Sequence, residues 1–305
     1  MKLLLTGAFN YSQDQLNILN SLGYEIIYIQ DERAPLQIDV SDVFAVVCNG
    51  LFLYNDIKKF KNLKFIQLTS AGLDRVPINY IKEKGISLFS AKGVYNIPMA
   101  EWVVLKLLEI YKKSKQFYEA QRDHKWEKQR NLLELTNKNA AIIGFGDVGI
   151  EVAKRLKAFD VNIFGVGRRK VESQYIDAYY LIEDIDQVLR KSDIVILTIP
   201  LTEETKYLIN EQKIKKMKDN SVLINVSRGG VIDEEAIIES LKEKKFLGVA
   251  LDVFEQEPLF KESQLWNFEN VIITPHNSFI SDKTNKKLFE KIIKNLGDYQ
   301  GNFGT

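Results

Sequence analysis

Cysteine is almost absent from this 305-residue chain, which contains only Cys48. A lone cysteine rules out an intrachain disulfide and fits a reducing, cytoplasmic compartment. Because it lies in the apolar run Val43–Cys48, we interpret Cys48 as an unreactive core residue.

Long apolar runs and an excess of either charge are also missing. No run approaches the roughly 20 residues that a membrane-spanning helix needs. Met1–Gly7 begins like a signal peptide, but the chain turns polar at Asn10–Asp14, too early for one. The formal net charge of +1 provides no basic field for nucleic acid or an anionic membrane. The sequence therefore predicts neither kind of partner.

Histidine is nearly as rare, with only His124 and His276. His124 lies in the charged run Arg122–Lys125 and is interpreted as a solvated surface residue. His276 instead follows an apolar run and Pro275, which gives it a different setting. No metal site is predicted.

The remaining composition is that of a globular protein, with 45% hydrophobic and 27% charged residues, and its length suits two domains. Strand and helix patterns alternate over the first ninety or so residues and again from Asn139, which predicts parallel sheets covered by helices. The expected strands are Lys2–Leu5, Tyr24–Ile29, Val43–Val47, Phe65–Thr69 and Ile86–Phe89, then Ala140–Ile143, Asn162–Val166, Ile194–Thr198, Val222–Val226, Leu247–Leu251 and Val271–Thr274.

Three helical patterns frame these strands. Ser12 and Gln15 have the spacing of a capping box for a first helix that Gly23 ends. A long pattern runs from Asn96 to about Trp126, enough to link two domains. The last pattern, at about Asp282–Tyr299, places Leu288, Ile292, Ile293 and Leu296 on one face.

A glycine-rich segment, Gly144-Phe145-Gly146-Asp147-Val148-Gly149, follows a strand and opens the helical run Ile150–Ala158. In that order the three glycines are typical of a dinucleotide site: one for the tight turn, one for backbone approach to pyrophosphate, and one for helix–strand packing. The N–H groups of Asp147 and Val148 are then expected to face the phosphates.

The acid that usually binds the ribose 2′-hydroxyl of NAD, about twenty residues further on, is missing. Gly167 stands at that place and is followed by Arg168, Arg169 and Lys170. Charge runs are usually solvated turns, but these cations fall where a 2′-phosphate would lie, and arginine can bind phosphate bidentately. We therefore expect NADP(H) to be preferred, with NAD possible.

Three polar motifs follow buried strands near the C-terminal end. They are Asn225-Val226-Ser227-Arg228-Gly229-Gly230, Asp252-Val253-Phe254-Glu255-Gln256-Glu257-Pro258 and Thr274-Pro275-His276-Asn277-Ser278. Arg228, Glu257 and His276 are thus expected at the carboxyl ends of neighbouring strands, where open parallel sheets bind ligands. Arginine binds a carboxylate or polarises a carbonyl, histidine transfers a proton, and the glutamate holds the ring in its protonated form. The trio suits reduction of a 2-keto acid.

In this order and setting the motifs resemble the D-isomer-specific 2-hydroxyacid dehydrogenase family. The resemblance implies that Arg228, Glu257 and His276 are catalytic, with Arg228 and His276 also binding substrate. It implies that Ala71 and Gly72, in Thr69-Ser70-Ala71-Gly72-Leu73-Asp74, hold the substrate carboxylate through backbone N–H groups. It adds Thr198, Pro200, Thr205, Val226 and Asp252 to the cofactor-binding residues, with Asp252 on the nicotinamide carboxamide. Without the surrounding motif, Asp252 would be read as a cap or turn residue.

The resemblance also implies an α/β fold in which a Rossmann dinucleotide-binding domain, residues 97–280, is inserted into a smaller flavodoxin-like substrate domain, residues 1–96 plus 281–305. The function implied is NAD(P)H-dependent reduction of a small 2-keto acid, such as glyoxylate or hydroxypyruvate, to the D-2-hydroxy acid. A homodimer is expected, formed largely through the long helix after Asn96 and the dinucleotide-binding domain, because the helix carries more aromatic residues than one linking helix should expose. These are Trp102, Tyr111, Phe117, Tyr118 and Trp126.

Two alternatives stay open. Phosphoglycerate dehydrogenases of serine biosynthesis share the family pattern but tend to carry an arginine where this chain has Asn49-Gly50-Leu51-Phe52-Leu53-Tyr54. The other alternative is a non-catalytic, dinucleotide-sensing protein of the same fold. It is disfavoured because such proteins carry extra tails that recruit partners, whereas this sequence ends at Thr305 without one.

Overall fold

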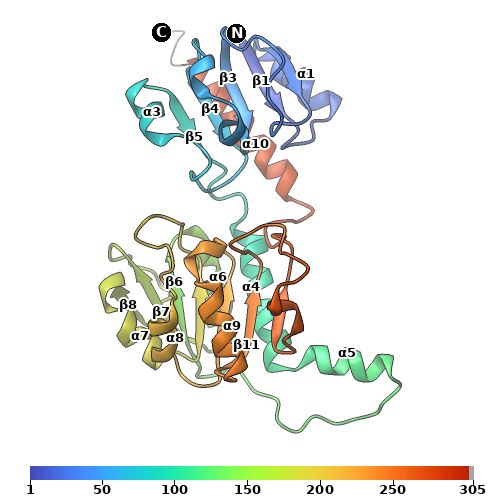
Figure 1. The fold of residues 1–305 in the computed structure, drawn as a ribbon. Coiled ribbons are helices and arrows are strands. Elements are labelled where there is room, and N and C mark those ends of the chain that lie inside the picture. The colour runs from blue at the N-terminus through green and yellow to red at the C-terminus, as the bar shows by residue number, and fades with distance from the viewer. Residues whose placement is uncertain (302–305) are drawn as a thin grey trace. The chain divides into compact units, whose positions relative to one another are not determined.

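The structure, a computed structural model, describes residues 1–301 and divides into two compact units. Unit 1 consists of Met1–Tyr95 and the described part of Ser281–Thr305, and unit 2 of Asn96–Ile280. The predicted domain boundaries were 96/97 and 280/281, and the two units divide at 95/96 and 280/281. The chain therefore leaves unit 1 once and returns to it with its last helix (Figure 1).

Unit 1 contains a five-stranded parallel sheet with the order β2-β1-β3-β4-β5. The strands are β1 (Lys2–Thr6), β2 (Glu25–Ile29), β3 (Val43–Cys48), β4 (Phe65–Leu68) and β5 (Ser87–Phe89). This is the flavodoxin-like order, and it reverses direction between β1 and β3. The predicted fold class of this unit is confirmed.

The helices of unit 1 are α1 (Gln13–Ser21), α2 (Leu51–Tyr54), α3 (Ile78–Glu83) and α10 (Thr284–Gly301), with a short 3-10 turn at η1 (Ile57–Lys59). The capping box of Ser12 and Gln15 is present at the start of α1, and Gly23 follows the helix with a φ of 81°. Helix α10 packs on this sheet, because Asn295 Nδ2 donates to the buried Gln67 at 2.6 Å.

Unit 2 contains a seven-stranded sheet with the order β12-β11-β10-β9-β6-β7-β8, again all parallel. Its strands are β6 (Asn139–Ile143), β7 (Asn162–Gly167), β8 (Ala178–Leu181), β9 (Ile194–Leu197), β10 (Ser221–Asn225), β11 (Phe246–Leu251) and β12 (Val271–Ile273). This is the Rossmann order with one further strand, and it reverses between β6 and β9. Strand β8 was not expected, because its four residues are half-buried or exposed and show no buried run.

Helices cover both faces of this sheet, so β9 is completely buried and reads as an unbroken apolar run. The helices of unit 2 are α4 (Asn96–Tyr111), α5 (Ser114–Arg122), α6 (Asp147–Lys157), α7 (Ile185–Lys191), α8 (Glu211–Lys216) and α9 (Glu234–Lys242), with 3-10 turns η2 (Ile182–Asp184), η3 (Gly229–Val231) and η4 (Gln264–Asn267). Helices α4 and α6 pack on one face of the sheet and α7, α8 and α9 on the other (Figure 1).

The expectation of one helix from Asn96 to Trp126 was wrong. The helix breaks at Lys113, whose backbone is left-handed with a φ of 55°, and α5 ends at Arg122. Helix α4 buries Val103 and Leu107 in the core, whereas α5 buries no residue. Because α5 makes no core packing, nothing holds it in line with α4. Tyr111 is only 3% exposed and belongs to the core, which also corrects its expected place on an interface.

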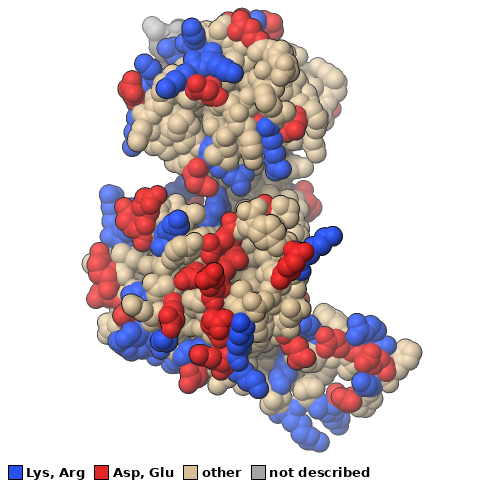
Figure 2. All heavy atoms as spheres, in the orientation of Figure 1, with Lys and Arg blue, Asp and Glu red and all other residues tan. Residues whose placement is uncertain are grey.

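The surface agrees with the nearly balanced composition. Figure 2 shows Lys and Arg interspersed with Asp and Glu over the face drawn, with acidic side chains gathered around α9. Among the described residues, no helix has the length and hydropathy that a membrane crossing requires.

Candidate active site

Arg228, Glu257 and His276 lie on three loops at one edge of the sheet of unit 2. Strands β10, β11 and β12 are neighbours and parallel, so the loops that leave their carboxyl ends emerge side by side. Nδ1 of His276 lies 2.8 Å from Oε2 of Glu257, within hydrogen-bond distance. The side chains of both residues are about one-third exposed or less, so the pair is open to a small ligand.

The charge of Glu257 is set by competing effects. Burial alone would raise the pKa of this carboxyl, but the hydrogen bond and charge of His276 lower it, with further help from Phe254 N–H and from Arg228. The net pKa lies below the ordinary value of glutamate, so Glu257 is ionised at neutral pH. With Nδ1 of His276 directed at this carboxylate, Nε2 is the nitrogen left to exchange a proton with a substrate.

Arg228 is carried by a turn that the buried Asn225 closes. Asn225 Nδ2 donates to the carbonyl oxygen of Arg228 at 2.9 Å, and its Oδ1 accepts bonds from the N–H and hydroxyl of Ser227. Arg228 Nη1 donates to the Ser227 carbonyl, also at 2.9 Å. The guanidinium group stays half-buried and close enough to lower the pKa of Glu257.

Asp252 organises the loop that carries His276. Its carboxylate, which is fully buried, accepts bonds from the Thr274 hydroxyl at 2.5 Å, Asn277 N–H at 2.8 Å and Ser278 N–H at 2.9 Å. Its carbonyl oxygen accepts from His276 N–H at 2.8 Å. These contacts fit the turn role that the isolated residue suggested, and its predicted contact with a nicotinamide stays a prediction.

A second set of contacts fixes the loop that carries Glu257. Glu255 N–H donates to Glu234 at the start of α9, and Glu234 N–H donates back to Glu255. Tyr207 OH donates to the same Glu255 carboxylate at 2.8 Å. A Cβ atom at Gly229 would lie 1.8 Å from the carbonyl carbon of Phe254, so only glycine lets the Arg228 loop approach this one.

The glycine-rich turn has a different constraint at each glycine. Gly144 has a φ of 97°, and a Cβ there would lie 2.5 Å from the backbone of Ile199. A Cβ at Gly146 would meet nothing within 4 Å, so this position is open, as backbone approach of a pyrophosphate requires. A Cβ at Gly149 would lie 2.9 Å from the Gly144 carbonyl oxygen, which shows close packing of α6 on the turn. The local geometry therefore fits a dinucleotide.

Asp147 and Val148 form the first turn of α6, so their N–H groups lie at a helix N-terminus. The loop after β9 lies beside this turn, because Thr198 Oγ1 donates to the Gly144 carbonyl at 2.7 Å. The Thr205 hydroxyl closes that loop by donating to the Pro200 carbonyl at 2.7 Å. Val226 is only 2% exposed and packs in the core, so its side chain is structural.

The basic turn follows β7 at the same edge of the sheet. Gly167 is buried as the last residue of β7, whereas Arg168, Arg169 and Lys170 are all exposed. The pKa of the Glu204 carboxyl is lowered, first by a hydrogen bond from the Thr202 hydroxyl and further by the positive charge of Arg168. The cations are thus accessible to an anion.

The predicted substrate residues Ala71 and Gly72 belong to unit 1, in the loop after β4. Ser70 Oγ donates to the Gly72 carbonyl at 3.0 Å, and Ala71 is exposed. The segment 49–54 follows β3 and includes α2, where Leu53 and Tyr54 are exposed. These residues are not among those that unit 2 brings together.

Sequence reasoning did not assign roles to several residues that shape the site. Asn225 and Gly229 belong to the motif that contains Arg228. For Asn225, a polar residue at the end of a buried strand could have indicated a structural role. Glu234, Glu255 and Tyr207 act through contacts between distant segments, which no local pattern reveals. Among the described residues, no group of His, Cys, Asp or Glu could hold a metal ion.

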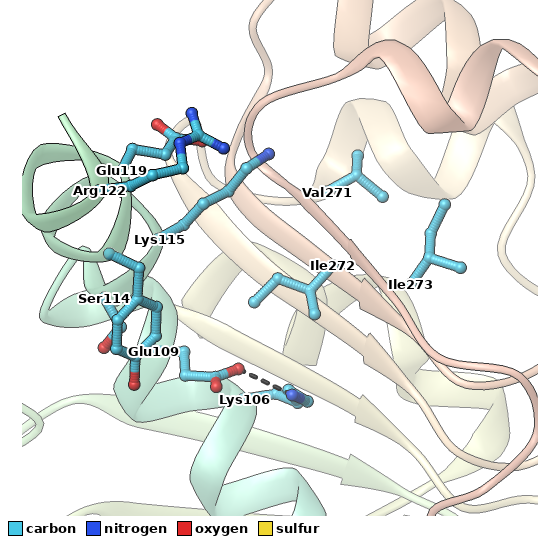
Figure 3. Close-up of a pocket in the computed structure, with 10 residues that line it drawn as sticks. Lys106, Glu109, Ser114, Lys115, Glu119, Arg122, Val271, Ile272 and Ile273 are labelled. Atoms are coloured by element: carbon cyan, nitrogen blue, oxygen red, sulfur yellow. Dashed lines mark hydrogen bonds and ion pairs between the residues drawn. The ribbon is translucent and has the colours of Figure 1, made fainter.

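A separate groove of about 500 Å³ lies between α4, α5 and β12 (Figure 3). The Lys106–Glu109 ion pair lies on one side, and Val271, Ile272 and Ile273 line the other. It contains none of the predicted site residues, so the chemistry described above does not depend on it.

The sequence model of the NAD binding domain of D-isomer specific 2-hydroxyacid dehydrogenases matches residues 104–278. A glyoxylate reductase from Thermofilum pendens is 37% identical over 243 residues, which cover 77% of this chain and 71% of that protein. A D-3-phosphoglycerate dehydrogenase from Methanocaldococcus jannaschii is 32% identical over 293 residues, 94% of this chain but only 55% of that protein. A solved structure of an acyclic imino acid reductase in complex with NADPH and D-Arg has a TM-score of 0.86 at 25% identity and covers 99% of this chain and 98% of that chain.

Proposed function

Because the chain belongs to the D-isomer specific 2-hydroxyacid dehydrogenase family, we propose that it reduces a small 2-keto acid to the D-2-hydroxy acid with NADPH. The observation that carries this proposal is the hydrogen bond between Glu257 and His276 on loops adjacent to that of Arg228. The cofactor supplies the hydride, so the protein has to bind, orient and protonate the substrate.

Each member of the trio has a role that its contacts support. The Arg228 guanidinium binds the substrate carboxylate and keto oxygen through its planar fork. His276, protonated, donates from Nε2 to the oxygen that becomes the hydroxyl group. Glu257 accepts from Nδ1, which fixes the orientation of the ring and leaves Nε2 for the substrate. The predicted backbone donors Ala71 and Gly72 remain a prediction.

The preference for NADPH rests on the end of β7. The usual ribose-binding acid is replaced by Gly167, and the next three residues are exposed cations. An arginine fork can bind the 2′-phosphate bidentately, and no carboxylate stands at residue 167 to repel it. NADPH bound in the imino acid reductase of similar fold is consistent with this preference.

The far end of the substrate is proposed to be small, apolar or uncharged. Segment 49–54 contains no cation, and its Leu53 and Tyr54 side chains are exposed. Phosphoglycerate dehydrogenase is the second candidate, because such a relative matches 94% of the chain. A phosphate group would lack a partner in that segment, which favours glyoxylate, hydroxypyruvate or a branched 2-keto acid.

Steady-state rates with a panel of keto acids and both cofactors test this proposal. We expect kcat/KM to be highest for one of the uncharged-end keto acids, higher with NADPH than NADH, and very low for simple aldehydes and ketones. If phosphohydroxypyruvate has the highest kcat/KM, the second candidate is correct. Equal kcat/KM for the two cofactors would contradict the NADPH preference alone.

A homodimer is part of the proposal. Helix α5 and the segment after it expose large apolar side chains without burying any residue of α5. They are Phe117, Tyr118, Trp126, Leu132 and Leu133. Large apolar side chains exposed on one segment favour an interaction surface, and a second copy of the chain is the simplest partner for it.

A further inference from the structure

Tyr179, on the edge strand β8, packs over two glycines of β7. The strands pair with Gly165 opposite Tyr179 and Gly167 opposite Leu181. A Cβ atom at Gly165 would lie 2.9 Å from the ring carbon Cδ2 of Tyr179, and one at Gly167 would lie 2.4 Å from its hydroxyl oxygen. Side chains essentially never approach so closely, so the tyrosine occupies this place because both positions are glycine.

The hydroxyl group of Tyr179 also holds the basic turn that follows β7. It donates a hydrogen bond of 2.7 Å to the main-chain carbonyl oxygen of Arg169. The ring meets Phe145 of the glycine-rich turn edge to face, with centroids 6.3 Å apart. Burial raises the pKa of the phenol, so it remains a donor at neutral pH. One side chain thus connects both turns of the predicted cofactor site.

We propose that Tyr179 is a specificity-determining residue for the adenosine end of the dinucleotide, an inference that rests on the NADPH preference proposed above. Its hydroxyl group fills the space that the side chain of an acid at residue 167 would need. Such an acid would bind a ribose 2′-hydroxyl and repel a 2′-phosphate. Through its bond to Arg169, Tyr179 orders the turn from which Arg168 and Arg169 extend.

The first test uses two nucleotides that differ by the 2′-phosphate, 2′,5′-ADP and 5′-AMP, titrated calorimetrically into the whole protein. Loss of one hydrogen bond in Tyr179→Phe should weaken 2′,5′-ADP binding roughly two- to tenfold and leave 5′-AMP unchanged. Tyr180→Phe is the matched control, since its ring packs against Phe164 on the other face and should alter neither affinity.

The two proposals fail in different ways in this experiment. If the unmodified protein binds both nucleotides equally, the NADPH preference is refuted, and the ligand role of Tyr179 with it. If the unmodified protein prefers 2′,5′-ADP and Tyr179→Phe leaves the ratio of the two affinities unchanged, only the role of Tyr179 is refuted.

The second test measures thermal unfolding and needs no cofactor. Gly167→Ala should lower Tm by roughly 3 °C or more, because its Cβ overlaps the Tyr179 hydroxyl. In the Tyr179→Phe background that loss should largely disappear, since the next ring atom, Cζ, lies 3.6 Å away. Gly165→Ala is the control: its Cβ meets ring carbons that phenylalanine retains, so its Tm loss should persist. An equal loss for Gly167→Ala in both backgrounds would overturn the steric part of the inference.

Discussion

The bond between Glu257 and His276 determines what the histidine can do. In the proposed reaction the proton comes from Nε2 of His276, because Nδ1 faces a carboxylate that burial does not neutralise. Proton donation by a positioned histidine is typically worth about 10²–10⁴ in rate. We therefore expect His276→Ala to lower kcat/KM for keto acid reduction by that factor, as steady-state kinetics would measure.

Glu257→Gln should change the pH dependence of reduction. In the folded protein the pKa of Glu257 lies below its ordinary value of 4.5, so the pair is stabilised above that pH and the stabilisation is lost as pH falls through the lowered pKa. Glutamine removes this negative charge from the pair, so we expect the pH dependence of kcat/KM for reduction to change.

The measurement is a pH–rate profile for the variant and for Glu262→Gln, which removes an equal charge from an exposed position. The control should keep the profile of the unmodified protein. An identical profile for Glu257→Gln would remove Glu257 from the proton-transfer machinery.

Gly146→Ala should weaken cofactor binding without changing the stability of the fold. Its Cβ would meet no atom within 4 Å, so Gly146→Ala should leave Tm unchanged. If pyrophosphate approaches this backbone, the added methyl costs about 1–3 kcal/mol of binding, a rise in the dinucleotide Kd of roughly 5- to 150-fold. Gly149→Ala is the comparison, because its Cβ meets the Gly144 carbonyl and should lower Tm. Unchanged dinucleotide affinity in Gly146→Ala would place the cofactor elsewhere.

At the scale of elements, the site depends on how closely the loops after β10 and β11 approach. Gly229→Ala would place a Cβ 1.8 Å from the carbonyl carbon of Phe254, so the two backbones must separate. We expect a loss of about 3 kcal/mol of stability and at least a hundredfold loss of kcat/KM, since Arg228 and Glu257 lie on these loops.

The neighbouring glycine provides the control for that change. A Cβ at Gly230 would lie 3.4 Å from the Leu201 side chain, an ordinary contact, so Gly230→Ala should retain both stability and activity. Thermal unfolding and steady-state kinetics of the two variants decide the matter. A Gly229→Ala protein with unchanged Tm would contradict the close approach of the loops.

The elements also show why part of the site could be predicted. Strand β9 is an unbroken apolar run, and β10 contains the apolar run Val222–Ile224, so the carboxyl ends of these strands, and the residues that follow them, could be predicted from the sequence. Strand β8 has no such run, and without it the contact of Tyr179 with Gly167 was invisible. The break at Lys113 was equally hidden, because the helical pattern continues through a left-handed residue that is not glycine.

At the scale of the molecule, the fold class followed from alternation alone, since each unit repeats strand and helix around one parallel sheet. The family pattern added the insertion of one unit into the other, which composition could not show. The two hydrogen bonds between Glu234 at the start of α9 and Glu255 in the Glu257 loop could not be predicted, because the two residues meet only when the whole unit folds.

Association into a homodimer depends on the apolar side chains that the whole folded chain leaves exposed. Trp126 is 95% exposed and Tyr118 65%, on a segment that has no core of its own, so a second copy is expected to cover them. Light scattering at micromolar concentration should give twice the mass of one chain. Tyr118→Ser with Trp126→Ser should shift the mass toward that of one chain, whereas Phe260→Ser, which removes an aromatic ring that is 60% exposed outside this segment, should leave the dimer intact. If the unmodified protein is already a monomer at that concentration, water rather than a partner covers these side chains, and the dimer proposal fails whatever the variants do.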